Sequence, residues 1–256
     1  MKKANTAKKL GSVLIVVLFW IAVWFCAARF VDKELLLPYP HTVLRALAKL
    51  CLDPQFWKNV GLTLGRILLG ILLGTILGTG LAILTCRFSF VYRLVSPLIT
   101  VIRATPVASF IILVLIWLGA GKMPVFICFL MVLPIVWAAV SDGIRALDGK
   151  MAEVCKVYRF SFVKRLKYFY IPSVLPYFLS ACKTSIGMAW KAGVAAEVLA
   201  VTPNSIGKQL YNTKIYLETP ELFAWTTVVI LLSLAIEKTA TLLLRRLRKR
   251  RSYADS

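Results

Sequence analysis

The chain has 256 residues, of which 59 % are hydrophobic and only 17 % are charged. A soluble domain of this length would be about half apolar and a quarter charged, so the composition excludes an ordinary soluble protein and favours a membrane protein. The formal net charge of +21 would suggest nucleic-acid binding in a soluble protein. Here Lys and Arg gather at the ends of apolar runs, as the positive-inside rule expects, so we predict no nucleic-acid partner.

The long apolar runs, such as 13–25, 67–84 and 228–236, indicate the fold class. Several reach the roughly 18–20 residues that cross a bilayer core as a helix. They are continuous and not alternating, which predicts helices instead of a barrel. We therefore expect an all-α polytopic membrane protein with a single transmembrane domain over residues 1–256. Its six transmembrane helices are expected at about 10–30, 61–85, 99–119, 124–140, 173–196 and 222–244.

The first span begins after the basic residues 2–9 and resembles a signal peptide. Its apolar run is long and no Ala-x-Ala site follows, so we expect it to remain uncleaved. After Pro38 and Pro40, apolar residues at helical spacing predict a short helix on the membrane surface. The second span has small-xxx-small spacing, which we interpret as close packing within the chain in preference to dimerisation. Its glycines are Gly61, Gly65, Gly70, Gly74 and Gly78.

The second half of the chain sets the orientation. Gly119, Gly121 and Pro124 are expected to turn the chain between the third and fourth spans. More Lys and Arg fall in segments that would be inside if both termini were cytoplasmic, and this bias places the charged loop 141–172 in the cytoplasm. No internal repeat is evident, which counts against many secondary transporters.

The loop is predicted to form a helix–turn–helix. Met151, Val154, Cys155 and Tyr158 fall on one helical face, with Gly149 as a break before them. Ser161 is a natural N-cap for a second helix, in which Phe162, Leu166, Phe169 and Tyr170 share a face, and Pro172 is expected to limit that helix. Exposed apolar faces mark partner surfaces, although this one could also pack on the chain's own spans or on lipid head groups.

The loop resembles the EAA loop of ABC importer permeases, whose pattern is E-A-A-x3-G-x9-I-x-L-P. Glu153-Val154-Cys155 matches its start and Ile171-Pro172 its end. The resemblance implies a coupling helix that docks on a cytoplasmic ATPase subunit. Arg159 stands where the family has glycine, and a left-handed residue with a Cβ costs about 1–2 kcal/mol, so we expect either a different turn or a right-handed conformation here. The residues assigned to coupling are Met151, Glu153, Val154, Cys155, Tyr158, Arg159, Phe162, Ile171 and Pro172.

Nearly the whole chain is similar to permeases of the nitrate, sulfonate and taurine class. The segments that carry this similarity are 37–44, 103–106, 115–119, 190–198, 206–210 and 222–225. The resemblance implies a bacterial inner-membrane protein that moves a small, anionic solute. It also implies a second permease copy, an external solute-binding protein, and ATP used by the partner ATPase with no cofactor bound by this chain.

Charges within the spans are candidates for the solute path. Each costs at least about 2.5–3.5 kcal/mol at mid-bilayer, so it should face a cavity, an interface or a partner. We expect Arg103, Trp190, Lys191 and Glu197 to line the path, with a structural ion pair between helices as the alternative.

Catalytic chemistry finds no support in the sequence. No Walker A or hydrolase motif occurs, and His41 is the sole histidine. The six cysteines are scattered and form no CxxC pair, so no metal site is predicted. We therefore predict that the chain is not an enzyme. An ion-gradient-driven secondary transporter, a membrane-embedded enzyme and a non-transporting scaffold remain the alternatives.

Overall fold

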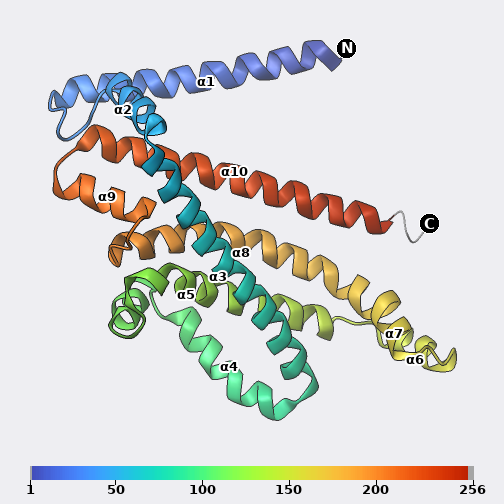
Figure 1. Cartoon of the computed structure of the whole chain (residues 1–256). Coiled ribbons are helices and arrows are strands. Elements are labelled where there is room, and N and C mark those ends of the chain that lie inside the picture. Colours follow the sequence, from blue (N-terminus) through green and yellow to red (C-terminus); the bar gives the residue numbers. More distant parts are fainter. Residues whose placement is uncertain (1, 253–256) are drawn as a thin grey trace. The chain divides into compact units, whose positions relative to one another are not determined.

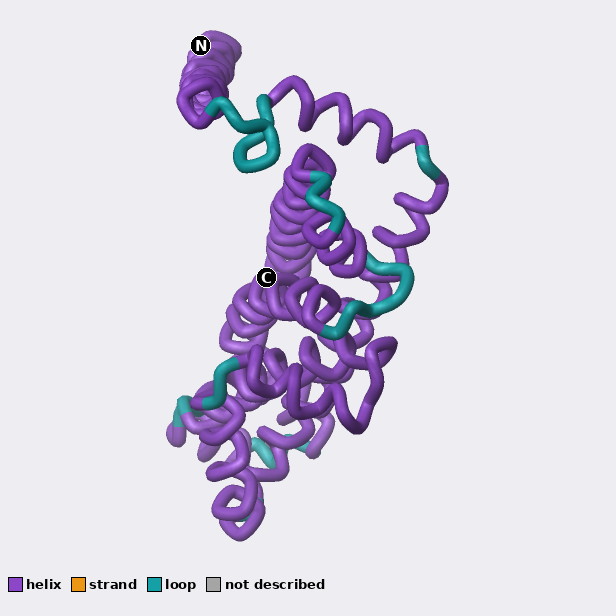
Figure 2. The backbone as a smooth tube through the Cα atoms, turned by 90° about the vertical axis from the view of Figure 1, so that its left-hand side faces the viewer, coloured by secondary structure: helices purple, strands orange, loops and turns teal. Residues whose placement is uncertain are grey.

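Every regular element of the described chain is a helix. The computed structural model describes the backbone of residues 2–252 and the side chains of residues 15–243, apart from Ala152 and Lys156. Within residues 2–252 no strand occurs (Figure 2), as the continuous apolar runs predicted. Met1 and residues 253–256 of the predicted domain, and the side chains of the basic run 245–251, lie outside the described parts.

Ten α-helices and one π-helix follow one another along the described chain (Figure 1). They are α1 (Lys2–Val31), α2 (Pro40–Leu52), α3 (Pro54–Arg87), α4 (Ser89–Ala104), α5 (Val107–Arg145), α6 (Gly149–Val157), α7 (Phe162–Arg165), the π-helix η1 (Leu166–Tyr170), α8 (Ile171–Leu199), α9 (Ile206–Ile215) and α10 (Thr219–Ser252).

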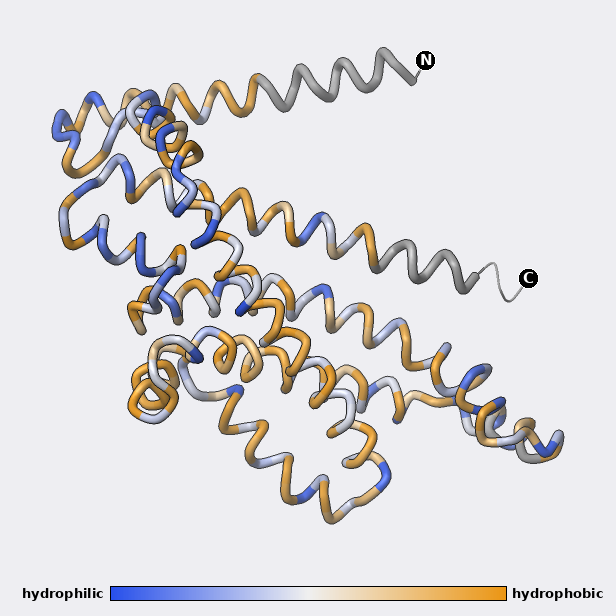
Figure 3. The backbone as a smooth tube through the Cα atoms, viewed as in Figure 1, coloured by the Kyte–Doolittle hydropathy of each residue, from blue (hydrophilic) through white to orange (hydrophobic). Residues whose placement is uncertain are grey.

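Three of the described helices are long and apolar enough to cross a membrane. They are α3, α5 and the Thr219–Leu243 part of α10. A shorter apolar segment, Ile15–Val31, lies in α1. Apolar residues dominate α3, α4 and α5 along their length, whereas α9 carries more hydrophilic ones (Figure 3).

The backbone divides into two compact units. The first comprises the chain up to Asn59 together with Gln209–Ile230. In it the Thr219 hydroxyl donates a hydrogen bond to the Leu35 carbonyl at 2.7 Å. Two aromatic pairs complete its packing: Trp24 stacks on Phe223, and the Phe56 and Trp225 rings lie 5.1 Å apart. The helix predicted in this region is present as α2, while its place on the membrane surface stays a prediction. Pro40 can begin it because a residue in the first turn of a helix donates no backbone hydrogen bond within the helix.

The second unit comprises Val60–Lys208 and the chain from Leu231 onward. Its core lies where α3 and α8 pack on α5. Glycines let α3 approach α5 closely. A Cβ added at Gly70 would lie 2.5 Å from Cys128 Cβ, which is too short for two carbon atoms in contact. Gly74 and Gly78 meet α5 in the same way, so these three glycines pack within the chain as predicted. Gly61 and Gly65 face open space in the described structure.

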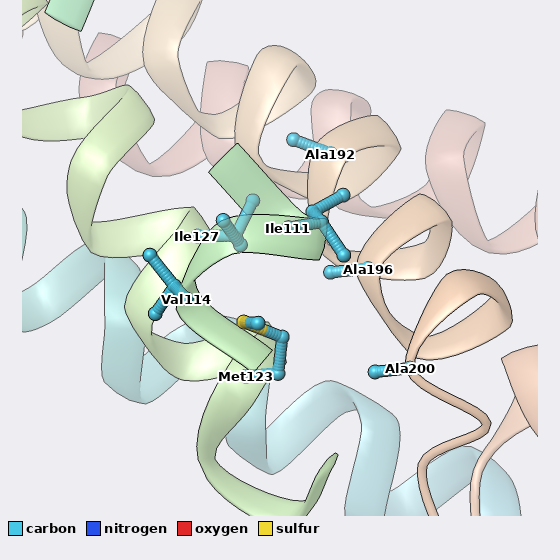
Figure 4. Close-up of a cluster of buried hydrophobic side chains, with 7 residues drawn as sticks. All are labelled: Ile111, Val114, Met123, Ile127, Ala192, Ala196 and Ala200. Atoms are coloured by element: carbon cyan, nitrogen blue, oxygen red, sulfur yellow. The ribbon is translucent and has the colours of Figure 1, made fainter. Parts of the chain in front are cut away.

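One apolar cluster joins the two halves of α5 to α8 (Figure 4). Large side chains of α5 meet alanines of α8 and of the turn that follows it. The small alanine side chains leave room for the larger residues opposite, so the packing density of the core is kept. The members are Ile111, Val114, Met123, Ile127, Ala192, Ala196 and Ala200.

The bounds of the third and fourth predicted spans differ from the helices observed. The prediction of a continuous helix over 99–119 is wrong, because α4 ends at Ala104 and α5 begins at Val107. Pro106 explains the break, since a proline disfavours helical backbone at the residue before it, and Thr105 is extended with φ −81° and ψ 131°. The helical backbone that follows continues past residue 140 to Arg145.

The turn between these spans depends on one glycine. Gly119 has φ 68° and ψ 163° and interrupts the helical backbone inside α5, as expected for a turn at this position. A residue with a Cβ is strained at that φ, which explains a glycine here. Pro124 lies inside the helical segment after the interruption and does not itself break the backbone.

Candidate functional site

The first candidate site is the segment from α6 to the start of α8, which the sequence assigns to coupling. Helices α6 and α7 lie together beyond the ends of α5 and α8 (Figure 1). The predicted apolar stripe of α6 divides in two, because Cys155 is buried whereas Met151 and Val154 are exposed. Tyr158 is 73 % exposed and Phe162 75 %. Apolar residues on both sides of the turn are therefore available to a partner.

The turn after α6 is left-handed at Arg159. Its φ is 49°, a value that favours glycine. The Phe160 N–H donates to the Cys155 carbonyl at 3.0 Å, which is the six-to-one hydrogen bond of a Schellman cap. The expectation of a different or right-handed turn at this arginine is therefore wrong, because the left-handed conformation is kept and the strain is retained.

The start of α7 is capped as predicted. The Ser161 hydroxyl accepts a hydrogen bond from the Lys164 N–H at 3.4 Å. The Arg165 side chain donates to the Phe160 carbonyl at 3.2 Å and thereby ties α7 to the turn. Both interactions hold the second helix of the loop in one orientation relative to the first.

The prediction that Pro172 limits the second helix is wrong. Helix α7 continues through η1 into α8, and Tyr170 and Ile171 both have helical backbone angles. The Ile171 N–H reaches five residues back, to the Leu166 carbonyl. Such a π-turn loosens the helix directly before Pro172, whose ring would crowd the carbonyl four residues earlier. The loop is therefore joined to α8 by helical backbone throughout.

The remaining coupling residues occupy different environments. Glu153 and Arg159 are exposed, Ile171 is only just exposed, and Pro172 is half-buried in the first turn of α8. The exposed coupling residues are thus Met151, Glu153, Val154, Tyr158, Arg159 and Phe162, whereas Ile171 and Pro172 belong to the helix that follows.

The second candidate site comprises the four residues expected to line a solute path. Lys191 on α8 and Arg103 on α4 are exposed, whereas Trp190 and Glu197 are buried. The four side chains therefore do not share one surface. Lys191 and Arg103 are free to meet a solute or a neighbour from outside the fold, while Trp190 and Glu197 belong to its interior.

Glu197 is the centre of a buried polar network. Its side chain is fully buried, and one oxygen accepts from the Thr63 hydroxyl at 2.9 Å and from the Gly207 N–H at 3.2 Å. The other oxygen lies 3.5 Å from the Arg66 guanidinium. This is an ion pair between α3 and α8, the structural alternative that the sequence left open for Glu197.

Arg66 and Thr63 extend the network to the turn after α8. Arg66 donates to the carbonyls of Pro203 and Asn204 at 3.0 and 3.1 Å. The Thr63 hydroxyl also accepts from the Ile206 N–H at 3.0 Å. These hydrogen bonds join the turn to α3 and satisfy backbone polar groups of the turn that water would otherwise bind.

The same turn is linked to the interruption in α5. The Thr202 hydroxyl donates to the Ala120 carbonyl at 2.9 Å, one residue after Gly119. At Gly207 no Cβ fits, because it would meet the Glu197 side chain and the α8 backbone. The network therefore connects α3, α5, α8 and the start of α9.

Sequence reasoning missed Thr63, Arg66 and Gly207 as members of this network. Arg66 had a usable signal, because it is a lone charge inside the apolar run after Leu62 and such a charge needs a partner. No feature of the sequence marked Thr63 or Gly207 as members of the network, because only the fold brings these residues to Glu197. Among the described side chains no group of three His, Cys, Asp or Glu could hold a metal ion.

Long apolar helices, a kinked α5 and an exposed helical loop define the chain as a polytopic α-helical membrane protein. Residues 67–253 match the family described as binding-protein-dependent transport system inner membrane component. The chain belongs to this family, which is a transport permease family and not a family of enzymes.

Relatives with assigned roles are similar over most of the chain. The taurine transport system permease protein TauC of Escherichia coli (strain K12) is 23 % identical, and the match covers 93 % of this chain and 87 % of that protein. The putative aliphatic sulfonates transport permease protein SsuC of Bacillus subtilis (strain 168) is 25 % identical, with 91 % and 85 % covered. The chain thus resembles permeases of the nitrate, sulfonate and taurine class, as its sequence motifs predicted.

Solved structures support the fold. An amino acid ABC transporter crystallised with histidines matches with a TM-score of 0.61 at 20 % identity, covering 77 % of this chain and 94 % of that one. A bacterial ABC transporter involved in import of the acidic polysaccharide alginate also has a TM-score of 0.61, at 14 % identity, covering 96 % and 98 %. At such identities the likeness establishes the ABC transporter permease fold alone.

Proposed function

We propose that this protein forms the translocation path of an ATP-binding-cassette importer for a small, anionic solute, with ATP hydrolysed by a partner subunit. The observation that carries the proposal is the exposed apolar surface of residues 151–162, on a chain whose residues 67–253 match the permease family. Exposed aromatic side chains such as Tyr158 and Phe162 fit a docking site for another protein.

The topology that we propose has six spans, with both termini and the loop 141–172 in the cytoplasm of a bacterial cell. The spans are α1, α3, the segment 99–119 formed by the end of α4 and the start of α5, the part of α5 after Gly119, α8 and α10. Helix α8 has 29 residues and at 1.5 Å per residue is long enough to cross a bilayer. Both compact units would belong to one permease domain, and the excess of Lys and Arg in the proposed inner segments supports the orientation.

Energy would reach the spans through the loop. Residues 151–162 would dock on a cytoplasmic ATPase subunit as an EAA-type coupling helix. Helical backbone runs without a break from α7 through η1 into α8. Because a helix is stiffer than a flexible loop, this continuity supports the proposal that a movement of the loop would displace α8. A second permease copy would complete the path, and an external solute-binding protein would deliver the solute.

The solute would be a small anion of the nitrate, sulfonate or taurine type. The printed names of the relatives support this class. Exposed Lys191 and Arg103 supply positive charge that could meet such a solute, and buried Trp190 and Glu197 would position α8 behind them. An anion inside a membrane protein needs such a compensating charge.

Coupling can be tested in proteoliposomes that hold the permease with its ATPase. We expect the double variant Tyr158→Ala/Phe162→Ala to lose at least about tenfold in ATP-driven uptake, since it removes aromatic anchors of the interface. Leu52→Ala, which alters an exposed apolar residue of α2, is the matched control and should leave uptake unchanged. Uptake that survives ATP depletion but collapses with an ionophore would favour the ion-gradient-driven alternative.

The path can be tested at Lys191. We expect Lys191→Ala and Lys191→Met to reduce taurine, sulfonate or nitrate uptake while the complex still assembles, because a positive charge facing the anion is lost. Assembly is checked by co-purification with the ATPase. Wild-type uptake by both well-assembled variants would contradict the role of Lys191.

A further inference from the structure

A basic cavity lies where α3 ends, α4 begins and α5 ends. It has a volume of about 490 Å³, and all of its wall belongs to the second compact unit. Arg87 comes from the end of α3, Ser89 and Tyr92 from the first turn of α4, and Arg145 from the end of α5. Neither the coupling surface nor the Glu197 network includes these residues.

The cavity is lined by two arginines. Among the described side chains, neither Arg87 nor Arg145 forms an ion pair. Asp142 is the acidic neighbour of Arg145 on α5, and it lies beyond ion-pair distance. Arg145 instead lies over the Tyr92 ring, with the central carbon of its guanidinium 5.0 Å from the ring centroid. Tyr92 thus holds one arginine in place at the cavity wall.

The start of α4 adds further donors. Helix α4 has 16 residues, and its N-cap residue, Phe88, makes no side-chain capping bond. The N–H groups of the first turn therefore lack a side-chain acceptor, and the helix dipole favours an anion there. Ser89, in that turn, lines the cavity. Two arginines, a tyrosine and a free helix start thus converge on one space.

Exposed apolar residues stand close in sequence to the lining residues Thr85, Ser89 and Tyr92. Leu84 on α3 and Phe90 and Leu94 on α4 are all exposed. A polar cavity on helices that also expose apolar residues fits a molecule with a charged head and apolar tails. In the proposed topology this turn lies at the cytoplasmic surface of the membrane.

We propose that the cavity binds a phosphate group, and that its source is the headgroup of an anionic phospholipid in the cytoplasmic leaflet. The guanidinium groups of Arg87 and Arg145 would hold the phosphate oxygens, and the acyl chains would lie against Leu84, Phe90 and Leu94. The cytoplasmic placement rests on the proposed topology, whereas the phosphate site rests on the cavity alone.

Native mass spectrometry of the purified chain tests the proposal with phosphatidylglycerol, phosphatidylcholine and inorganic phosphate as separate probes. We expect phosphatidylglycerol to bind at least tenfold more tightly than phosphatidylcholine. Arg87→Gln and Arg145→Gln should each weaken that binding about fivefold, as expected for loss of one basic residue near an anionic lipid. Arg93→Gln removes a charge from exposed α4 surface outside the cavity and should have little effect.

Several results would overturn the proposal. An equal loss of phosphatidylglycerol affinity in Arg93→Gln and Arg145→Gln would mean that surface charge alone attracts the lipid. Inorganic phosphate that displaces phosphatidylglycerol at equal affinity would assign the cavity to a soluble anion and reject the lipid. Arg87→Lys and Arg145→Lys keep the positive charge and should still bind phosphatidylglycerol more tightly than phosphatidylcholine. This result would show that the weaker binding of the glutamine variants comes from lost charge and not from misfolding. Because the readout needs no ATPase and no transport, its failure would leave the proposed importer function standing.

Discussion

Single residues decide how the loop between α6 and α7 turns. Arg159 has a left-handed backbone at φ 49°, where a Cβ costs about 1–2 kcal/mol relative to glycine. The Schellman hydrogen bond from Phe160 to Cys155 is retained despite this cost. The strain therefore resides in a segment that we propose to meet the ATPase.

Replacing Arg159 by glycine should stabilise the turn. We expect Arg159→Gly to stabilise it by up to about 1 kcal/mol, because the relieved strain exceeds the greater freedom of glycine in the unfolded chain. Hydrogen exchange of the Phe160 amide should slow by about fivefold. Arg159→Ala removes the same charge but keeps the Cβ, so equal slowing in that variant would contradict the role of strain.

Glu197 is the second residue on which much depends. Removing its carboxylate leaves the Thr63 hydroxyl and the Gly207 N–H without this acceptor in a buried site and Arg66 without its ion-pair partner. We expect Glu197→Ala to destabilise the protein by about 3 kcal/mol or more, and Glu197→Gln by less, because an amide oxygen can still accept from Thr63. Thermal unfolding in detergent measures both.

A double-variant cycle separates the ion pair from the rest of the network. Glu197→Gln combined with Arg66→Met should cost less than the sum of the single changes, because no charge is left without its partner. Strict additivity would show that the 3.5 Å contact contributes nothing.

At the scale of elements, glycine spacing on α3 determines how closely α5 approaches. Gly70, Gly74 and Gly78 face α5 with no room for a Cβ, whereas Gly61 on the same helix faces open space. In the sequence all five glycines of α3 belong to the same small-xxx-small pattern. Only the packing of α3 on α5 distinguishes the three glycines in contact with α5 from Gly61 and Gly65, which face open space.

This difference can be measured with a matched pair of variants. Gly70→Ala should destabilise the protein by about 1–3 kcal/mol, because the new Cβ overlaps Cys128 Cβ and the Val125 carbonyl. Gly61→Ala should be neutral or stabilising by up to about 1 kcal/mol, as alanine is the better helix former. Equal melting temperatures for the two variants would disprove close packing at Gly70.

At the scale of the whole molecule, the orientation in the membrane determines which partner each surface can meet. The loop 151–162 can reach a cytoplasmic ATPase only if it lies inside the cell. The segment around Glu218, between α9 and α10, would then face outward, toward a solute-binding protein.

Thiol labelling of whole cells tests this orientation. In a variant without the six native cysteines, Tyr158→Cys should resist a membrane-impermeant maleimide until the cells are permeabilised. Glu218→Cys, also at an exposed position, should react in intact cells. Labelling of Tyr158→Cys from outside would reject both the topology and the coupling role.

The parts that the sequence could predict are those governed by local rules. The helical class follows from apolar run length, α2 from its prolines and periodicity, and the Ser161 cap from residue type. Pro106 carried enough local information to predict the break at Thr105, but the apolar run across it obscured that signal. Pro172 was misjudged because a π-turn absorbs the proline without ending the helix.

By itself the sequence determined the helical membrane class and the permease family motifs, because these depend on composition and spacing along the chain. Only the tertiary structure decided that Glu197 is bound by Thr63, Arg66 and Gly207, and that Arg87 and Arg145 line one cavity. These groups come from different helices, and no rule of periodicity relates residues on separate elements. Their meeting depends on how α3, α4, α5 and α8 pack.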